Sequence, residues 1–141
     1  MALRRRSEAA AGRAAGAQRV GDAARQLADT AATLPPGNDP ATVTVWWQLL
    51  DAQQAALTGA LAMRTTVAAD DPLAAALTDV EAARSALGDA VATDRTLRIG
   101  PPSPAGDQLA YSAAVVRERA GTLRDSAAEV ERLLLPPQAA G

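Results

Sequence analysis

Hydrophobic residues recur every three or four positions through four long segments of this chain. Three breaks separate the segments, at residues 34–40, 69–72 and 100–106, and each break combines Pro with Gly, Asp or Ser. The three-and-four spacing places the hydrophobic residues along one side of an α-helix, the side that packs into a core. The pattern predicts helices over residues 7–34, 40–69, 72–97 and 104–135.

The predicted core consists of one hydrophobic stripe from each helix. The stripes are Ala17, Val20, Ala24, Leu27, Ala31 and Leu34; Val43, Trp47, Leu50, Gln54, Leu57 and Leu61; Leu73, Leu77, Val80, Arg84, Leu87 and Val91; and Leu109, Ala113, Val116, Ala120, Leu123, Ala127, Val130 and Leu134. The second segment also carries a neighbouring line of Trp46, Leu49, Ala56, Ala60, Met63 and Val67. Its wide apolar face predicts that this helix is central in the bundle or faces a partner.

Three of the predicted helices begin with a capping side chain followed by proline, in Asp39-Pro40, Asp71-Pro72 and Ser103-Pro104. These three caps are spaced by 32 residues, and a further step of 32 residues towards the N-terminus predicts Ser7 as the fourth cap. Helices of equal length joined by short connections predict an all-α fold, an elongated four-helix bundle with up-down-up-down antiparallel topology. We expect the bundle to span residues 7–135, after a flexible basic N-terminus (1–6) and before a disordered tail (136–141).

The composition agrees with helices and limits the partners. Ala and Leu are abundant, whereas the chain has one Tyr and no Phe, so helix formers outnumber strand formers. All 14 basic residues are Arg, a bias typical of the GC-rich coding sequences of actinobacteria, so Arg counts carry little functional weight. The net charge of -2 predicts no binding of nucleic acid by the whole domain.

The residue types that carry most catalysis are missing from the sequence. Without His, Cys or Lys, the chain lacks the usual general base, the usual transition-metal ligands and an amine nucleophile. The adjacent carboxylates Asp70 and Asp71 could serve acid–base chemistry, but a helix cap explains them better. We therefore predict no enzyme, no catalytic residues, no cofactor and no metal site.

The candidate binding residues lie on the second and third predicted helices. Trp46 and Trp47 are consecutive, about 100° apart on a helix, so we expect one to be buried and the other partly exposed. The exposed one, with Met63, is the predicted protein interface, since Trp is enriched in binding hot spots. Arg84 interrupts a core stripe, which predicts a buried ion pair with Asp51 or a side chain that reaches the bundle edge.

Two further polar groups leave alternatives open. Gln53 and Gln54 form either a polar layer that fixes helix register or an exposed edge. The cluster Arg4, Arg5 and Arg6 is either a solvated terminus or a weak contact for an acidic surface. No apolar run is long enough for a signal peptide or a membrane span, so we expect a soluble, cytoplasmic protein.

These features favour a non-enzymatic interaction protein, an adaptor, small subunit or scaffold that binds a protein partner or a second copy of itself. The first alternative is a bundle that senses a small apolar molecule near Trp46, Trp47, Met63 and Arg84; the second is a secreted or virion-associated structural protein. The tryptophans stand inside a predicted helix as Trp-Trp-Gln. The chain therefore lacks the Trp-x-Gly turn of the small helical-hairpin substrates of type VII secretion, and no family is assigned.

Overall fold

Four α-helices make up almost all of the described chain in the computed structural model. The structure describes residues 2–37, 39–99 and 106–135, with side chains from residue 8 onward. The helices are α1 (Ala2–Ala32), α2 (Pro40–Leu61), α3 (Pro72–Ile99) and α4 (Gly106–Leu134), and a 3-10 helix, η1 (Ala62–Thr66), follows α2. The described ranges contain no strand, and the predicted all-α class is confirmed.

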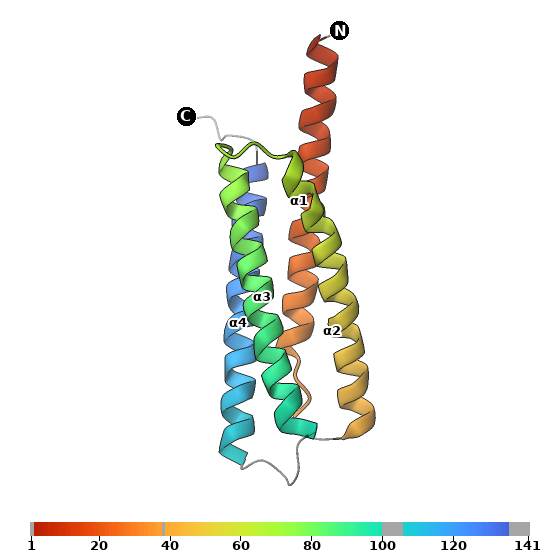
Figure 1. The fold of residues 1–141 in the computed structure, drawn as a ribbon, viewed down its shortest axis with the longest axis vertical. Helices are drawn as coiled ribbons and strands as arrows, with labels where there is room; N and C mark the ends of the chain where they lie inside the picture. Colours follow the sequence, from red (N-terminus) through yellow and green to blue (C-terminus); the bar gives the residue numbers. More distant parts are fainter. Residues whose placement is uncertain (1, 38, 100–105, 136–141) are drawn as a thin grey trace.

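The four helices pack side by side as a bundle that is much longer than it is wide (Figure 1). The closest packing joins α3 to α4 and α1 to α4, and α1 also lies against α2. The contact between α2 and α3 is much sparser. The helix with the widest apolar face is therefore not central in the bundle, and one alternative from the sequence, that α2 faces a partner, is still open.

The core follows the predicted stripes closely, with one shift in α2. The buried hydrophobic residues are Ala17, Val20, Ala24, Leu27, Ala28, Ala31, Leu34, Val43, Trp46, Leu50, Leu57, Leu61, Leu73, Ala76, Leu77, Val80, Ala83, Leu87, Val116, Ala120, Leu123, Ala127 and Val130. In α2 the buried positions are Trp46 and Gln53, where the sequence predicted Trp47 and Gln54. The other predicted residues of this stripe, Val43, Leu50, Leu57 and Leu61, are buried, so only two positions of α2 move to the neighbouring residue.

Two of the predicted helix caps are present. The Asp39 carboxylate accepts hydrogen bonds from the backbone N and the hydroxyl of Thr42, at 3.3 and 2.6 Å. The Asp71 carboxylate accepts one from the backbone N of Leu73 at 2.9 Å. Ser7 is not a cap, because α1 already begins at Ala2. The sequence placed this start too late, since Ala and Arg extend a helix without a specific signal.

The second predicted helix ends earlier than residue 69. Regular α-helix stops at Leu61, and a 3-10 turn continues to Thr66. The hydroxyl of Thr65 donates to the backbone oxygen of Ala62, and that of Thr66 to the oxygen of Met63. These local hydrogen bonds compete with the α-helical pattern and explain the early end.

Several predictions fall outside the described residues. They concern Ser103, the tail at 136–141, and the side chains of Arg4, Arg5 and Arg6, although the backbone of these arginines is helical. Within the described part of the chain, no helix is both long and apolar enough to cross a membrane.

Candidate functional site

The two tryptophans lie near the start of α2, one buried and one half-buried, as predicted. Trp46 is 6% exposed, and its indole Nε1 donates a 2.9 Å hydrogen bond to the backbone oxygen of Thr30 in α1. The ring of Trp47 is faced by the guanidinium of Arg95, 4.8 Å from the ring centre. Both rings are thus engaged by contacts within the chain, and an interface role for either is still a prediction.

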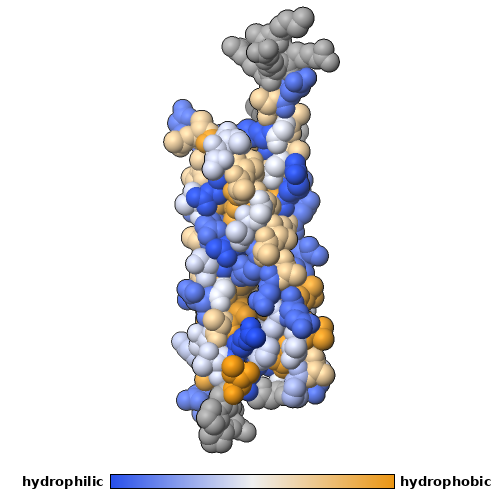
Figure 2. Space-filling model, turned by 45° about the vertical axis from the view of Figure 1, so that its right-hand side comes forward, coloured by the Kyte–Doolittle hydropathy of each residue, from blue (hydrophilic) through white to orange (hydrophobic). Residues whose placement is uncertain are grey.

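The most solvent-exposed apolar line of α2 and η1 lies on the outside of the bundle, and we call it the outer face of α2. Its six residues alternate between spacings of four and three: Val45, Leu49, Ala52, Ala56, Gly59 and Met63. Val45 is 64% exposed and Leu49 is 47% exposed, far more than a core stripe allows. The spacing is that of a helix–helix seam. In Figure 2 the larger hydrophobic residues gather in the lower half of the view, the end at which α2 begins.

The outer face of α2 carries no charge. The 22 residues of α2 include a single charged side chain, Asp51. Each residue turns an α-helix by about 100°, so Asp51, two residues after Leu49, lies about 200° round the helix from it, on a different side. A helix face open to water normally carries charged residues, and an apolar surface without them marks an interaction site.

A hollow of about 710 Å³ opens beside the C-terminal end of this face, between α1 and η1. Gly12 and Gly16 lie on the α1 side, and Gly59 and Met63 on the other. A Cβ atom at Gly16 would lie 3.1 Å from Met63 Cε, so this glycine lets Met63 pack closely on α1. A Cβ at Gly59 would meet nothing within 4 Å, so the space outside Gly59 is open.

An ion pair borders the hollow. Arg13 donates from Nη2 and Nε to the two carboxylate oxygens of Asp71, at 2.7 and 2.8 Å. These hydrogen bonds, with the one from the backbone N of Leu73, hold the pKa of Asp71 below its ordinary value. The pair joins the N-terminal half of α1 to the start of α3.

Arg84 pairs with Glu81 of its own helix, and the predicted pair with Asp51 is wrong. The Glu81 carboxylate accepts from Arg84 Nη2 and Nε at 2.6 and 2.7 Å. Asp51 is exposed on another side of α2, whereas Glu81 lies one turn before Arg84 on the same side of α3. The pair lies at the edge between α2 and α3, and its hydrogen bonds lower the pKa of Glu81 and raise that of Arg84.

The two glutamines in the middle of α2 have different surroundings. Gln54 accepts a 3.1 Å hydrogen bond from Arg84 Nη1, so it links α2 to α3. Gln53 is buried, and its Oε1 has no hydrogen-bond partner among the described residues. The alternative of two exposed glutamines is therefore wrong.

A buried ion pair that the sequence analysis missed lies near the end of α3. The side chains of Asp94 and Arg98 are 0% and 2% exposed, and Arg98 Nε donates to Asp94 Oδ2 at 2.6 Å. The Ser112 hydroxyl donates to the other carboxylate oxygen at 3.1 Å. Arg98 also donates to the backbone oxygens of Gly37 and Pro35, at 2.6 and 3.1 Å. These bonds tie the α1–α2 connection to α3 and α4, and so position the start of α2.

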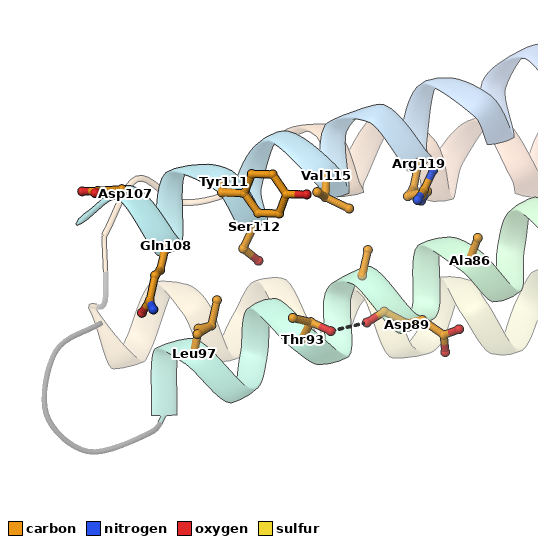
Figure 3. Close-up of a pocket in the computed structure, with 11 residues that line it drawn as sticks. Ala86, Asp89, Thr93, Leu97, Asp107, Gln108, Tyr111, Ser112, Val115 and Arg119 are labelled. Carbon is orange, nitrogen blue, oxygen red and sulfur yellow. Dashed lines mark hydrogen bonds between the residues drawn. The ribbon is translucent and has the colours of Figure 1, made fainter. Parts of the chain in front are cut away.

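A second candidate site is a groove of about 680 Å³ between α3 and α4 (Figure 3). The small and apolar side chains of Ala86, Ala90 and Val115 form part of its walls. Tyr111 lies over the α4 side and is 75% exposed, and Arg119 stands at one end. The residues that line this groove include neither tryptophan, nor Met63 nor Arg84, around which the sequence placed a small-molecule site.

No metal centre emerges from the described ranges, which contain no group of three or more His, Cys, Asp or Glu side chains able to hold an ion. Some charged side chains form ion pairs within one helix, and others join α1 to α4. Arg25 of α1 donates to Glu131 of α4 at 2.5 and 2.7 Å, and Arg124 of α4 pairs with Asp29 of α1. These pairs lie along the α1–α4 contact, away from the outer face of α2.

Comparison with known proteins found no match: no family model fits the sequence, and neither the curated proteins nor the solved structures gave a significant similarity.

Proposed function

We propose that this chain is a non-enzymatic helical interaction protein, an adaptor, small subunit or scaffold in a larger protein assembly. Its four helices run in up-down-up-down antiparallel order, as the short connection between η1 and α3 favours. The observation that carries the proposal is the outer face of α2, an exposed apolar line without charge on a helix that is packed mainly on one side.

The surroundings of α2 support this proposal. Trp46 and the Asp94–Arg98 pair hold the beginning of α2 in place, and Met63 packs the following turn against Gly16. The outer face is thus presented by a helix that is fixed at both ends. A surface that is ordered before binding loses less conformational entropy when a partner docks.

Affinity purification of the tagged full-length protein from its native host tests the proposal. The wild type is compared with Leu49→Arg, which places a charge on the outer face, and with Ala114→Arg, a matched charge on the exposed side of α4. We expect specific protein partners with the wild type and Ala114→Arg, and their loss with Leu49→Arg. Identical sets of bound proteins for all three would contradict a function through α2.

The groove between α3 and α4 favours a second candidate function, the binding of a small molecule. A ligand with an apolar body fits the alanine-lined walls and the ring of Tyr111, and an anionic group on that ligand would bind at the Arg119 end. The carboxylates of Asp89 and Asp107 also line the groove, and Asp107 lies at the end opposite Arg119. Calorimetric titration with decanoate should give saturable binding that Arg119→Gln weakens. No heat of binding, or equal binding by the variant, would remove this candidate.

A further inference from the structure

We propose that the occupant of the outer face of α2 is a second copy of this chain, docked antiparallel through the same face. The inference rests on the proposed function, because it names the partner of the same surface. Three features of the face favour a second copy: the order of its large and small residues, its lack of charge, and the hollow at one end.

The face has large side chains at one end and open space at the other. Val45 and Leu49 protrude near the start of α2, whereas Gly59 and the hollow beside Met63 lie near its end. An antiparallel pair with its twofold axis near position 54 places Leu49 opposite Gly59 of the other copy. The same register puts Val45 at the partner copy's hollow and Ala52 opposite Ala56.

A twofold interface brings the same patch of both copies together, so each protruding residue must find a recess within that patch. The outer face meets this requirement, because Leu49 and Gly59 lie at equal sequence distances on the two sides of position 54, and so do Val45 and Met63. In this pair Gly59 provides the recess for Leu49 of the other copy, a role that it does not have within the single chain. Glycine destabilises a helix interior relative to alanine, and no atom of the described chain lies near enough to require its small size.

The absence of charge on the outer face favours a second copy over a charged partner. In a twofold pair, a charged residue near the axis meets its own copy and repels it. The only charge of α2, Asp51, points away from the face, so two identical faces approach without repulsion. At the border of the hollow, Arg13 and Asp71 neutralise each other in an ion pair, and Arg19 is the third charged residue that lines it. In the antiparallel pair the two hollows lie at opposite ends of the interface, so the two copies of Arg19 do not meet.

The size of the face sets the expected strength of association. The stretch from Val45 to Met63 spans about 27 Å at a rise of about 1.5 Å per residue. With the adjoining half of α1 the paired surface is about two helices wide, which buries on the order of 1,000 Å² in total. This is the lower limit for a specific interface, so we expect a weak, reversible dimer.

Sedimentation velocity of the full chain from about 1 to 200 µM, a range wide enough to reveal weak, reversible association, tests the proposal. We expect the wild type to change from monomer to dimer over this range and Ala56→Arg to stay monomeric. Ala114→Arg, an equally exposed alanine of α4, should behave as the wild type. Circular dichroism checks that each variant is folded. A wild type that stays monomeric, or equal dissociation by both variants, would overturn the proposal.

Cysteine cross-linking tests the antiparallel register, because the natural sequence contains no cysteine. An equimolar mixture of Leu49→Cys and Gly59→Cys should oxidise to a covalent heterodimer, whereas neither protein alone should cross-link efficiently. Cross-linking of each variant with itself would indicate a parallel pair and would contradict the register.

The same variants separate this inference from the proposed function. If the wild type is monomeric in solution but loses a specific host protein on Leu49→Arg substitution, the self-pairing is wrong and the interaction function stands. If the face neither pairs with itself nor retains a host protein, both are wrong.

Discussion

Replacement of Asp94 by asparagine should cost the fold several kcal/mol, although only one carboxylate oxygen changes. The asparagine side chain has nearly the same volume as the aspartate, so no cavity opens. What changes is the charge opposite Arg98, whose side chain is 2% exposed. The guanidinium would keep the backbone oxygens of Pro35 and Gly37 as acceptors but would lose the buried negative charge of Asp94.

The size of the effect follows from this burial. Removal of one partner from a buried pair typically costs about 3–5 kcal/mol, because the remaining charge is out of water and uncompensated. A domain of this size has a total stability of roughly 5–15 kcal/mol. We therefore expect Asp94→Asn to lose about 3–5 kcal/mol and to lower the urea midpoint strongly.

Urea unfolding followed by circular dichroism measures the change, with two further variants as controls. The double substitution of Asp94→Asn with Arg98→Met removes both charges of the pair, and it should be more stable than Asp94→Asn alone, because the guanidinium is removed together with the carboxylate charge that it faces. Arg132→Ala breaks the exposed pair with Glu129 and should change the midpoint little. A loss below about 1 kcal/mol for Asp94→Asn would show that water reaches Arg98 and that the pair is not buried as described.

Three other measurements address the core, α1 and the ion pairs. Leu77→Ala and Leu123→Ala should each lose about 2–4 kcal/mol in urea unfolding, since both side chains are fully buried; a loss below about 0.5 kcal/mol would show that the site collapses or is open to solvent. Gly12→Ala should gain about 0.4–1 kcal/mol, because a Cβ there meets nothing, and a loss would contradict the open space around α1. The pKa values of Asp71 and Glu81 are lowered in the folded chain, so their contribution to stability is present at neutral pH and is lost as pH falls through the acidic range. The free energy of unfolding should therefore decline as the pH falls below the ordinary pKa values of Asp71 and Glu81, 3.8 and 4.5. A chain that becomes more stable on acidification would contradict this prediction.

The sequence predicted the helices and most of the core because burial in a bundle follows the helical period. It also contained the signal for the missed pair. The α3 stripe of Leu87 and Val91 reaches Asp94 and Arg98 when the same spacing of three and four is continued. Charged residues at core positions are uncommon, so the stripe was ended too early. The backbone oxygens of Pro35 and Gly37 could not be predicted as acceptors for Arg98, because these hydrogen bonds depend on the path of the connection between α1 and α2.

In α2 the helical period did not identify which tryptophan is buried. Trp46 and Trp47 both continue a plausible stripe, and periodicity alone does not decide between lines that differ by one residue. The choice depends on Thr30, whose backbone oxygen accepts the indole hydrogen bond. The prediction that Arg84 pairs with Asp51 was wrong for a similar reason, since the partner within one helix was closer than the partner across the bundle.

The placement of both tryptophans near the start of α2 makes their fluorescence a local probe. Trp46 lies between Thr30 and Arg98, and Trp47 faces Arg95, so their emission depends on one end of the molecule. Circular dichroism instead averages over all four helices. If the end held by Arg98 opens before the rest of the bundle, the emission will change at a lower urea concentration than the dichroism does.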